Sequence, residues 1–192
     1  LTLFYMDIKG LQLTEFVASG AGRMLTNAGS STSKGVEFSA DMQLGGGFSG
    51  GVNYGYAHAT FRHFTQIETV DGKPVEVDYS GKYIPYAPQQ TANVYLNYVK
   101  NFENSFLSQF YGNVSYSGIG KIYWQESNET VQDFYSLVDA KLGVRKNAFG
   151  LELWGKNLLN TTYNAFYFES FGNKFFQKGK PLQFGARLTL EI

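Results

Sequence analysis

Apolar and polar residues alternate without interruption over residues 36–44. The apolar positions are Val36, Phe38, Ala40, Met42 and Leu44, and the positions between them are Glu37, Ser39, Asp41 and Gln43. A period of two places successive side chains on opposite faces of an extended chain, so the segment predicts a β-strand with one apolar and one polar face. A soluble sandwich strand can carry the same pattern. A strand of a membrane barrel fits it equally, with the apolar face toward lipid and the polar face toward a wet lumen.

The same alternation recurs along the chain and predicts about eight strands. They are expected near residues 1–13, 27–44, 48–61, 89–99, 106–119, 134–146, 149–158 and 182–192. Short turns are expected at 45–47, 100–104 and 146–148, and a loop around Ser19–Gly22. Long loops are expected at 62–88, 120–133 and 160–181. Short turns on one side and long loops on the other are typical of outer-membrane barrels.

The last predicted strand favours a membrane over water. Its apolar row is Leu182, Phe184, Ala186, Leu188, Leu190 and Ile192. In water this row would form a large exposed apolar patch. The expected fold class is therefore all-β, an antiparallel transmembrane β-barrel.

Composition excludes several other classes. Charged residues make up 17% of the chain, below the roughly one quarter that is usual for globular domains. The 16 basic and 16 acidic residues cancel, which gives no electrostatic case for nucleic acid as a partner. There is no Cys, so no disulfide framework is expected. With only two His, His58 and His63, no metal site, cofactor or catalytic residue is predicted.

Charged side chains recur on the predicted lumen faces of the strands. They are Glu37, Asp41, Asp139, Lys141, Arg145, Glu152, Lys156 and Arg187. We interpret them as a solvated wall of mixed charge. A tight turn near Asn147 would bring Asp139 close to Lys156, where the two could form a cross-strand pair. A catalytic carboxylate pair is the alternative, but no positioned base or nucleophile accompanies these carboxylates.

Aromatic residues concentrate where the strands meet the long loops. Those singled out are Tyr83, Tyr86, Tyr123, Trp124, Tyr163, Phe166 and Tyr167, followed in sequence by Phe168 and Phe171. One interpretation is an aromatic girdle at the membrane interface. The other is a ligand-binding vestibule whose ring faces stack on a bound solute. The sequence does not show which of these residues belong to a girdle and which to a vestibule.

Three segments resemble motifs of TonB-dependent outer-membrane receptors. Residues 27–29 (N-A-G) and 33–38 (S-K-G-V-E-F) resemble the family's N-x-G…S-x-G-x-E pattern. Residues 83–88 (Y-I-P-Y-A-P), followed by Thr91, resemble its P-x-x-P entry to a strand. Residues 154–163 (W-G-K-N-L-L-N-T-T-Y) resemble its N-L-[FL]-[DN]-x-x-Y segment. One departure is Ile192, at an end where outer-membrane barrels usually carry an aromatic residue.

The resemblance implies that residues 1–192 form the C-terminal part of a barrel of roughly 22 strands. It implies a location in the bacterial outer membrane, among its lipids and lipopolysaccharide. The implied activity is TonB-dependent uptake of a scarce solute, most often an iron–siderophore complex, with haem, cobalamin or a glycan as other solutes. The TonB complex is expected to act through an N-terminal part, which includes the plug and the TonB box and lies outside this sequence.

Two other functions remain open at this point. A complete eight-stranded outer-membrane barrel could have a structural or adhesive role, because about eight strands can close such a barrel. An outer-membrane hydrolase would need His58 or His63 as its base, since these are the only His in the chain.

Overall fold

The computed structural model describes residues 1–16, 23–27, 29–70, 72–103, 105–170 and 173–191. The loop expected around Ser19–Gly22, together with Phe171 and Ile192, lies outside these ranges. All regular elements are β-strands, and within the described ranges no helix is long and apolar enough to cross a membrane.

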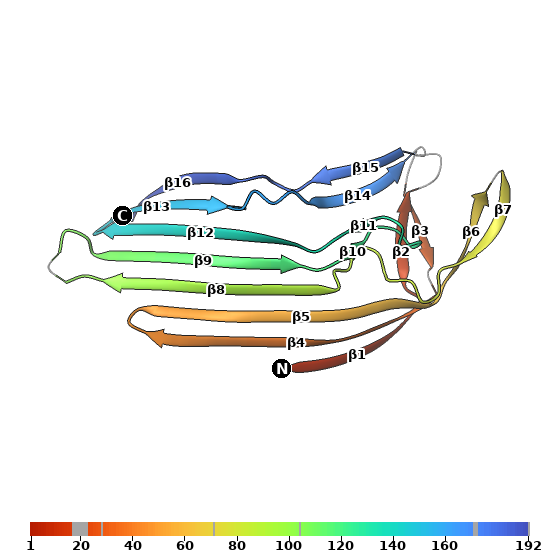
Figure 1. Cartoon of the computed structure of the whole chain (residues 1–192), viewed down its shortest axis with the longest axis horizontal. Helices are drawn as coiled ribbons and strands as arrows, with labels where there is room; N and C mark the ends of the chain where they lie inside the picture. Colours follow the sequence, from red (N-terminus) through yellow and green to blue (C-terminus); the bar gives the residue numbers. More distant parts are fainter. Residues whose placement is uncertain (17–22, 28, 71, 104, 171–172, 192) are drawn as a thin grey trace.

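Eight antiparallel strands form one sheet in the order β1-β4-β5-β8-β9-β12-β13-β16 (Figure 1). Their bounds are Thr2–Lys9, Ser30–Gly45, Phe48–His63, Gln90–Asn101, Gln109–Ile119, Tyr135–Lys146, Phe149–Lys156 and Gln183–Leu190. The predicted alternation is thereby confirmed as a set of paired strands. In the described residues no pairing joins β1 to β16, so these two strands form the edges of the sheet.

Tight turns join the strands at one end of the sheet, as predicted. Gly45, Gly46 and Gly47 join β4 to β5 with φ values of 80°, 61° and 90°, which glycine adopts without a steric penalty. Asn147, with φ of 51°, turns β12 into β13. The prediction that a strand begins at Phe106 is wrong: β9 begins at Gln109. Phe106 instead lies in the turn, where the Lys146 ammonium is 4.9 Å from its ring centroid.

Four hairpins extend from the opposite end of the sheet (Figure 1). They are β2–β3 (Gln12–Phe16 and Arg23–Asn27), β6–β7 (Thr65–Val70 and Lys73–Asp78), β10–β11 (Ile122–Tyr123 and Val131–Gln132) and β14–β15 (Asn164–Ser170 and Asn173–Lys178). The long connections predicted as loops therefore contain paired strands. The strand predicted over 1–13 is also divided, because Gly10, with φ of 66°, separates β1 from β2.

The register of the sheet brings its apolar side chains onto one face. Val36 pairs with Leu3 on β1 and with Tyr56 on β5, and Ala40 pairs with Val52. Many of these side chains are exposed: Phe184 is 80% exposed and Leu188 is 83% exposed. A broad exposed apolar face on hydrogen-bonded strands is typical of a sheet that faces hydrocarbon.

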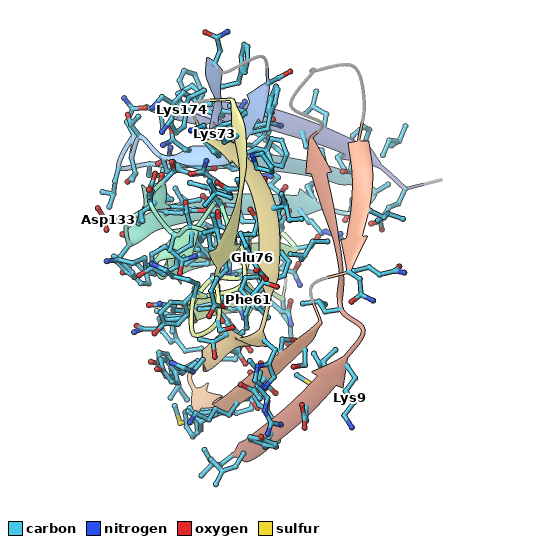
Figure 2. The ribbon with its side chains drawn as sticks, turned by 90° about the vertical axis from the view of Figure 1, so that its right-hand side faces the viewer. Lys9, Phe61, Lys73, Glu76, Asp133 and Lys174 are labelled. Atoms are coloured by element: carbon cyan, nitrogen blue, oxygen red, sulfur yellow. The ribbon has the colours of Figure 1, made fainter. Side chains whose placement is uncertain are left out.

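The sheet is curved, as Figure 2 shows in a view from the hairpin end. From β1 to β16 it follows an arc, and the β2–β3 hairpin lies on the open side of that arc. β2 approaches β14, although their neighbours β1 and β13 lie far apart in the sheet order. The β2–β3 hairpin therefore crosses the open side of the arc toward β14.

Candidate ligand-binding surface at the hairpin end

The segment between β7 and β8, residues 79–89, connects two buried clusters. The first cluster is Phe61, Phe64 and Tyr79, with Ile84 from this segment packed against it. The second is Ile122, Trp124 and Tyr167, with Ile119 packed against it. Because the clusters draw on β5 and on three different connections between the strands of the sheet, they hold the hairpin end together much as a small core holds a domain.

Tyr86 brings this segment into contact with the second cluster. Its ring lies edge-on to Trp124, with centroids 5.5 Å apart, and stacks near Phe166 at 5.7 Å. Its hydroxyl donates a hydrogen bond to the Tyr167 carbonyl at 2.9 Å. Tyr86 has a φ of 63°, an uncommon conformation for a bulky residue and one that the surrounding contacts hold in place.

Exposure separates the rings that could meet a solute from those that support them. Trp124 is 4% exposed and Tyr167 is 1% exposed, whereas Tyr86 is 45% exposed and Phe166 is half-buried. We call these four residues the aromatic platform. Its accessible members are Tyr86 and Phe166, and its buried members are Trp124 and Tyr167.

A polar network lies under the aromatic platform. The Tyr167 hydroxyl donates to the Glu169 carboxylate, and Gln125 Nε2 donates to the same carboxylate at 2.7 Å. Burial, together with the hydrogen bond to Glu169, raises the pKa of Tyr167 to about 12. The phenol therefore remains a neutral donor at physiological pH, which suits a buried supporting role.

Asn128 fixes the backbone of residues 79–89 from the β10–β11 hairpin. Its Oδ1 accepts the Tyr83 N–H at 2.7 Å, and its Nδ2 donates to the Tyr83 carbonyl at 2.9 Å. Nδ2 also donates to the Gln125 carbonyl at 3.0 Å. Asn tolerates the φ of 59° found here, and its amide can replace a backbone partner. Sequence reasoning missed this residue because one Asn in a loop carries no pattern.

Tyr83 and Tyr123 form a separate group. Their rings are stacked, with centroids 5.1 Å apart and an interplanar angle of 13°, and His58 meets Tyr83 at 5.1 Å. On β5, His58 has the same parity as Tyr56 and thus lies on the apolar face of the sheet. This position favours the girdle interpretation for Tyr83 and Tyr123.

Tyr163 stacks on a ring outside both groups. Its ring stacks on Tyr135 at 4.3 Å with an interplanar angle of 10°. Gly179 lies against the ring, leaving no room for a Cβ at that position. The seven aromatic residues predicted as one set thus divide into four in the aromatic platform, two on the apolar face and Tyr163 by itself.

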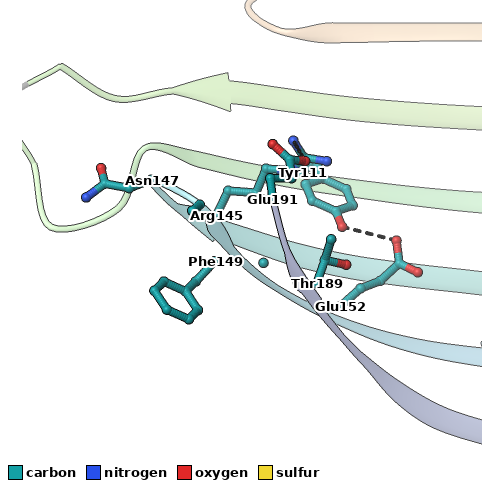
Figure 3. Close-up of a pocket in the computed structure, with 9 residues that line it drawn as sticks. Tyr111, Arg145, Asn147, Phe149, Glu152, Thr189 and Glu191 are labelled. Atoms are coloured by element: carbon teal, nitrogen blue, oxygen red, sulfur yellow. Dashed lines mark hydrogen bonds and ion pairs between the residues drawn. The ribbon is translucent and has the colours of Figure 1, made fainter.

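On the polar face, one interaction geometry occurs twice. Tyr111 of β9 crosses Gly143 of β12 and donates to Glu152 of β13 at 3.1 Å (Figure 3). Tyr95 of β8 crosses Gly51 of β5 and donates to Asp41 of β4. A Cβ on Gly51 would come within 2.7 Å of the Tyr95 ring, so glycine is required for the ring to lie flat across the strand.

Glu152 also forms ion pairs with two of the cations predicted for the lumen wall. Lys141 Nζ lies 4.0 Å from one of its oxygens, and Arg187 Nη1 lies 3.9 Å from the other. Arg145 pairs with Glu191 at 3.0 Å beside a small cavity of about 20 Å³ (Figure 3). Of the other charges predicted there, Glu37 lies opposite Gly55 and Lys156 opposite Gln183. Lys141, Glu152 and Arg187 thus form a contiguous group, and the role of all eight residues as a lumen wall stays a prediction.

The register that pairs Ala140 with Gly155 places Asp139 beside Lys156, as the tight turn near Asn147 predicts. No ion pair joins the two in the described part of the chain, and Asp139 instead accepts the Asn157 backbone N–H at 2.8 Å. Asn157 is buried, and its side chain bonds to the backbone of Thr161 twice and to the Lys180 carbonyl at 3.0 Å. The motif residue Asn157 therefore ties the start of the β13–β14 connection to its return before β16.

Metal ligands do not cluster in the described ranges: no three His, Cys, Asp or Glu side chains there lie close enough to hold a metal ion. His58 packs against Tyr83, as described above. The interactions found at this end of the sheet are ring stacking, hydrogen bonds and ion pairs such as Lys174–Glu169 at 3.7 Å.

Comparison with known families gives a match over most of the chain. The model of the TonB dependent receptor-like β-barrel family matches residues 1–158. This span includes all but the last three strands, β14 to β16.

Solved structures give the same fold. The ferric yersiniabactin uptake receptor FyuA from Yersinia pestis aligns with a TM-score of 0.77 and 20% identity over 98% of this chain and 26% of its own. The siderophore receptor PiuA from Acinetobacter baumannii aligns at 0.73 and 15% identity, over 98% of this chain and 25% of its own. The ferric-catecholate import receptor Fiu from E. coli aligns at 0.63 and 21% identity, over 97% and 24%. The chain thus spans about a quarter of the length of these receptors.

Proposed function

Because the chain belongs to the family of TonB-dependent receptor-like β-barrels of the bacterial outer membrane, we propose that it forms part of a receptor that imports an iron–siderophore complex. In this proposal residues 1–192 are one section of the barrel domain. They supply lipid-facing wall, lumen-facing wall and ligand-contacting loops. The family consists of receptors and transporters, so the section binds and conducts the solute without chemical change.

Two observations support a section of a larger barrel. The sheet has edges at β1 and β16, and hydrocarbon does not tolerate unpaired backbone groups along a strand edge. The chain also covers only 24–26% of the receptors it resembles in fold. A complete eight-stranded barrel would instead pair β1 with β16, and the sheet offers no support for that alternative.

The observation that carries the proposed ligand class is the aromatic platform. Tyr86 and Phe166 present ring faces at the end of the sheet where the hairpins gather, and Trp124 and Tyr167 hold them from beneath. Siderophores are compact and often carry aromatic chelating groups, which stack well on such rings. The three aligned receptors are described as receptors for siderophores or for ferric yersiniabactin and ferric catecholates. Haem, cobalamin and glycans would use the same ring faces.

The charged polar face is proposed to line the lumen. Glu152, with Lys141 and Arg187, and Asp41, with Tyr95, present hydrogen-bonding groups of both signs that a polar plug domain could contact. The TonB complex would act on that plug through an N-terminal part of the receptor. We propose no cofactor and no catalytic residue.

The test uses the complete receptor that contains this chain, in cells that lack other siderophore receptors. Tyr86→Ala/Phe166→Ala should reduce uptake of radio-iron, delivered as a catecholate, by about tenfold or more, since two stacking contacts are lost. Tyr54→Leu, a change on the apolar face, is the matched control and should leave uptake unchanged. Equal uptake by the double variant and the wild type, at equal surface abundance, would contradict the proposed role of the aromatic platform.

A further inference from the structure

Two buried polar atoms in the loop of the β10–β11 hairpin lack hydrogen-bond partners. Among the residues that the structure describes, nothing accepts from Trp124 Nε1 or donates to Gln125 Oε1, and both atoms are closed to solvent. Buried polar atoms in native proteins are nearly all paired, because an unpaired one has lost its hydrogen bonds to water. The two atoms are one donor and one acceptor on consecutive residues, so a group that both accepts and donates would complement them.

Contacts with β14 fix the two side chains. Gln125 Nε2 donates to the Glu169 carboxylate at 2.7 Å, which leaves Oε1 as the unpaired end of the amide. The Tyr167 hydroxyl donates to the same carboxylate, and Trp124 packs with Tyr167 in the second buried cluster. Trp124 and Gln125 therefore both adjoin Tyr167, at the base of the aromatic platform.

Tyr86 separates Trp124 from solvent. Its ring lies edge-on to the indole, with centroids 5.5 Å apart, and is 45% exposed where Trp124 is 4% exposed. The φ of 63° at Tyr86 is sparsely populated by bulky residues and carries strain. A change of conformation that uncovers Trp124 would relieve this strain, which partly offsets the ring contacts that Tyr86 gives up.

We propose that Trp124 Nε1 and Gln125 Oε1 form a subsite for a secondary amide of the imported solute. The indole N–H donates to the amide carbonyl, and Gln125 Oε1 accepts the amide N–H. The Tyr86 ring turns from Trp124 onto the aromatic group of the solute, so it remains a stacking partner. The inference rests on the proposed function and deepens it, because it assigns the solute to a class: an aromatic chelator attached through secondary amides.

An amide fits this pair of atoms better than the other groups of an iron chelate. Iron-bound phenolate oxygens only accept hydrogen bonds, so they would leave Gln125 Oε1 unpaired. An ammonium group only donates, so it would leave the Trp124 N–H unpaired. A secondary amide has its donor and its acceptor on different atoms, which suits two side chains of consecutive residues.

The experiment measures equilibrium binding of two radio-iron complexes to the complete receptor in detergent. One probe is a ferric tris-catecholamide with secondary amides. The other is its N-methylated counterpart, which keeps the rings, the carbonyls and the iron but lacks the amide N–H. The wild type should bind the N–H probe about 5- to 10-fold more tightly, the equivalent of one hydrogen bond. Gln125→Met, which lacks the acceptor, should bind the two probes equally.

Three further variants separate the subsite from a structural effect. Trp124→Phe removes the indole N–H and should weaken binding of both probes by about 5- to 10-fold, because both retain the carbonyl. Trp154→Phe, on β13 where the indole lies against Gly185, is the matched control and should change neither affinity. Glu169→Gln alters the neighbouring group and should keep the preference for the N–H probe. Heat-modifiable migration checks that each variant is folded.

The outcomes distinguish the subsite from the proposed function. Equal binding of the two probes by the wild type would overturn the subsite alone, and this comparison needs no variant. Unchanged affinity of folded Trp124→Phe would also overturn it, and would assign the two buried atoms to ordered water only. Binding of neither probe by the wild type would contradict the proposed catecholate receptor together with this subsite.

Discussion

The eight-stranded sheet and the aromatic platform at its end are stabilised by different interactions. In the sheet, the six inner strands β4, β5, β8, β9, β12 and β13 are hydrogen-bonded on both sides, and the register continues from one strand to the next. Around the aromatic platform, short hairpins are held by ring contacts and by side-chain amides such as that of Asn128. The sheet is therefore cooperative and repetitive, whereas the platform depends on a few particular residues.

This difference bears on function. The sheet must keep its backbone hydrogen bonds closed against lipid. A repeating pattern suits this role, because no single outward side chain is then essential. A surface that recognises one solute needs specific groups at specific positions, on segments that can open locally without unfolding the wall. Substitutions in the two regions should consequently differ in which measurement they affect.

The largest effect is expected where the sheet does depend on one residue, at Gly143. Gly143→Val places a branched side chain where the Tyr111 ring lies, so the ring must leave and its bond to Glu152 is lost. Overpacking and the lost hydrogen bond together should lower the free energy of unfolding of the receptor by about 3 kcal/mol. Urea unfolding in lipid bilayers measures this change.

A compensating variant distinguishes this cause from a general effect of valine. Tyr111→Ala removes the ring, so Gly143→Val/Tyr111→Ala should be more stable than the sum of the two single changes predicts. Strict additivity would show that the ring and the glycine are not coupled.

The next effect is expected at the junction of the two regions. Asn157→Ala removes three side-chain hydrogen bonds at a buried position with φ of 49°, at a cost of about 2–3 kcal/mol. Asn157→Gly loses the same hydrogen bonds, but glycine adopts the positive φ without strain. It should therefore recover only the part of the stability loss that comes from backbone strain in the alanine variant. Limited proteolysis measures the result as faster cleavage within residues 157–163. Faster cleavage in the strands of the sheet, with residues 157–163 unchanged, would contradict this prediction.

A smaller effect is expected in the segment of residues 79–89, beside the aromatic platform. Asn128→Ala frees the Tyr83 backbone and should cost about 1–2 kcal/mol locally. Hydrogen exchange at Tyr83 should speed up by roughly 5- to 30-fold, while exchange in β8 and β9 stays as in the wild type. Exchange that rises equally in the sheet would show that the two regions are not separable.

The smallest effect is expected on the lipid-facing side of the sheet. Leu142→Ala shortens a side chain that is 57% exposed and should change the stability in bilayers by less than about 1 kcal/mol. Leu142→Arg, which places a charge in hydrocarbon, should cost about 2–4 kcal/mol and serves as the contrast. Similar values for both variants would argue that this face is not in lipid.

The wall could be predicted from sequence because its physical cause is local. Alternation at 36–44 determines which side chains share a face, and Gly45–Gly47 and Asn147 mark turns by their conformational tolerance. The boundaries were less accurate: Phe106 resembled a strand residue but lies in a turn against Lys146.

The platform could not be predicted to the same extent. The alternation that assigns side chains to one face ends where the strand ends. Nothing in the sequence therefore separates Tyr83, on the apolar face, from Tyr86, which lies three residues later in the aromatic platform. The hairpin β6–β7 has six-residue strands of mostly polar character, too short for a clear period. Asp139 bonds to a backbone N–H rather than to Lys156 because the buried Asn157 fixes the chain there.

The most direct test of the account is a cysteine scan of residues 36–44 in the complete receptor, reconstituted in bilayers. Residues 1–192 contain no Cys, so each introduced Cys is the single labelling site in this section of the receptor. We predict that collisions with oxygen dominate at Val36, Phe38, Ala40, Met42 and Leu44, and collisions with a water-soluble nickel complex at Glu37, Ser39, Asp41 and Gln43. Accessibility without a period of two, or oxygen collisions highest at the charged positions, would contradict a membrane-spanning wall.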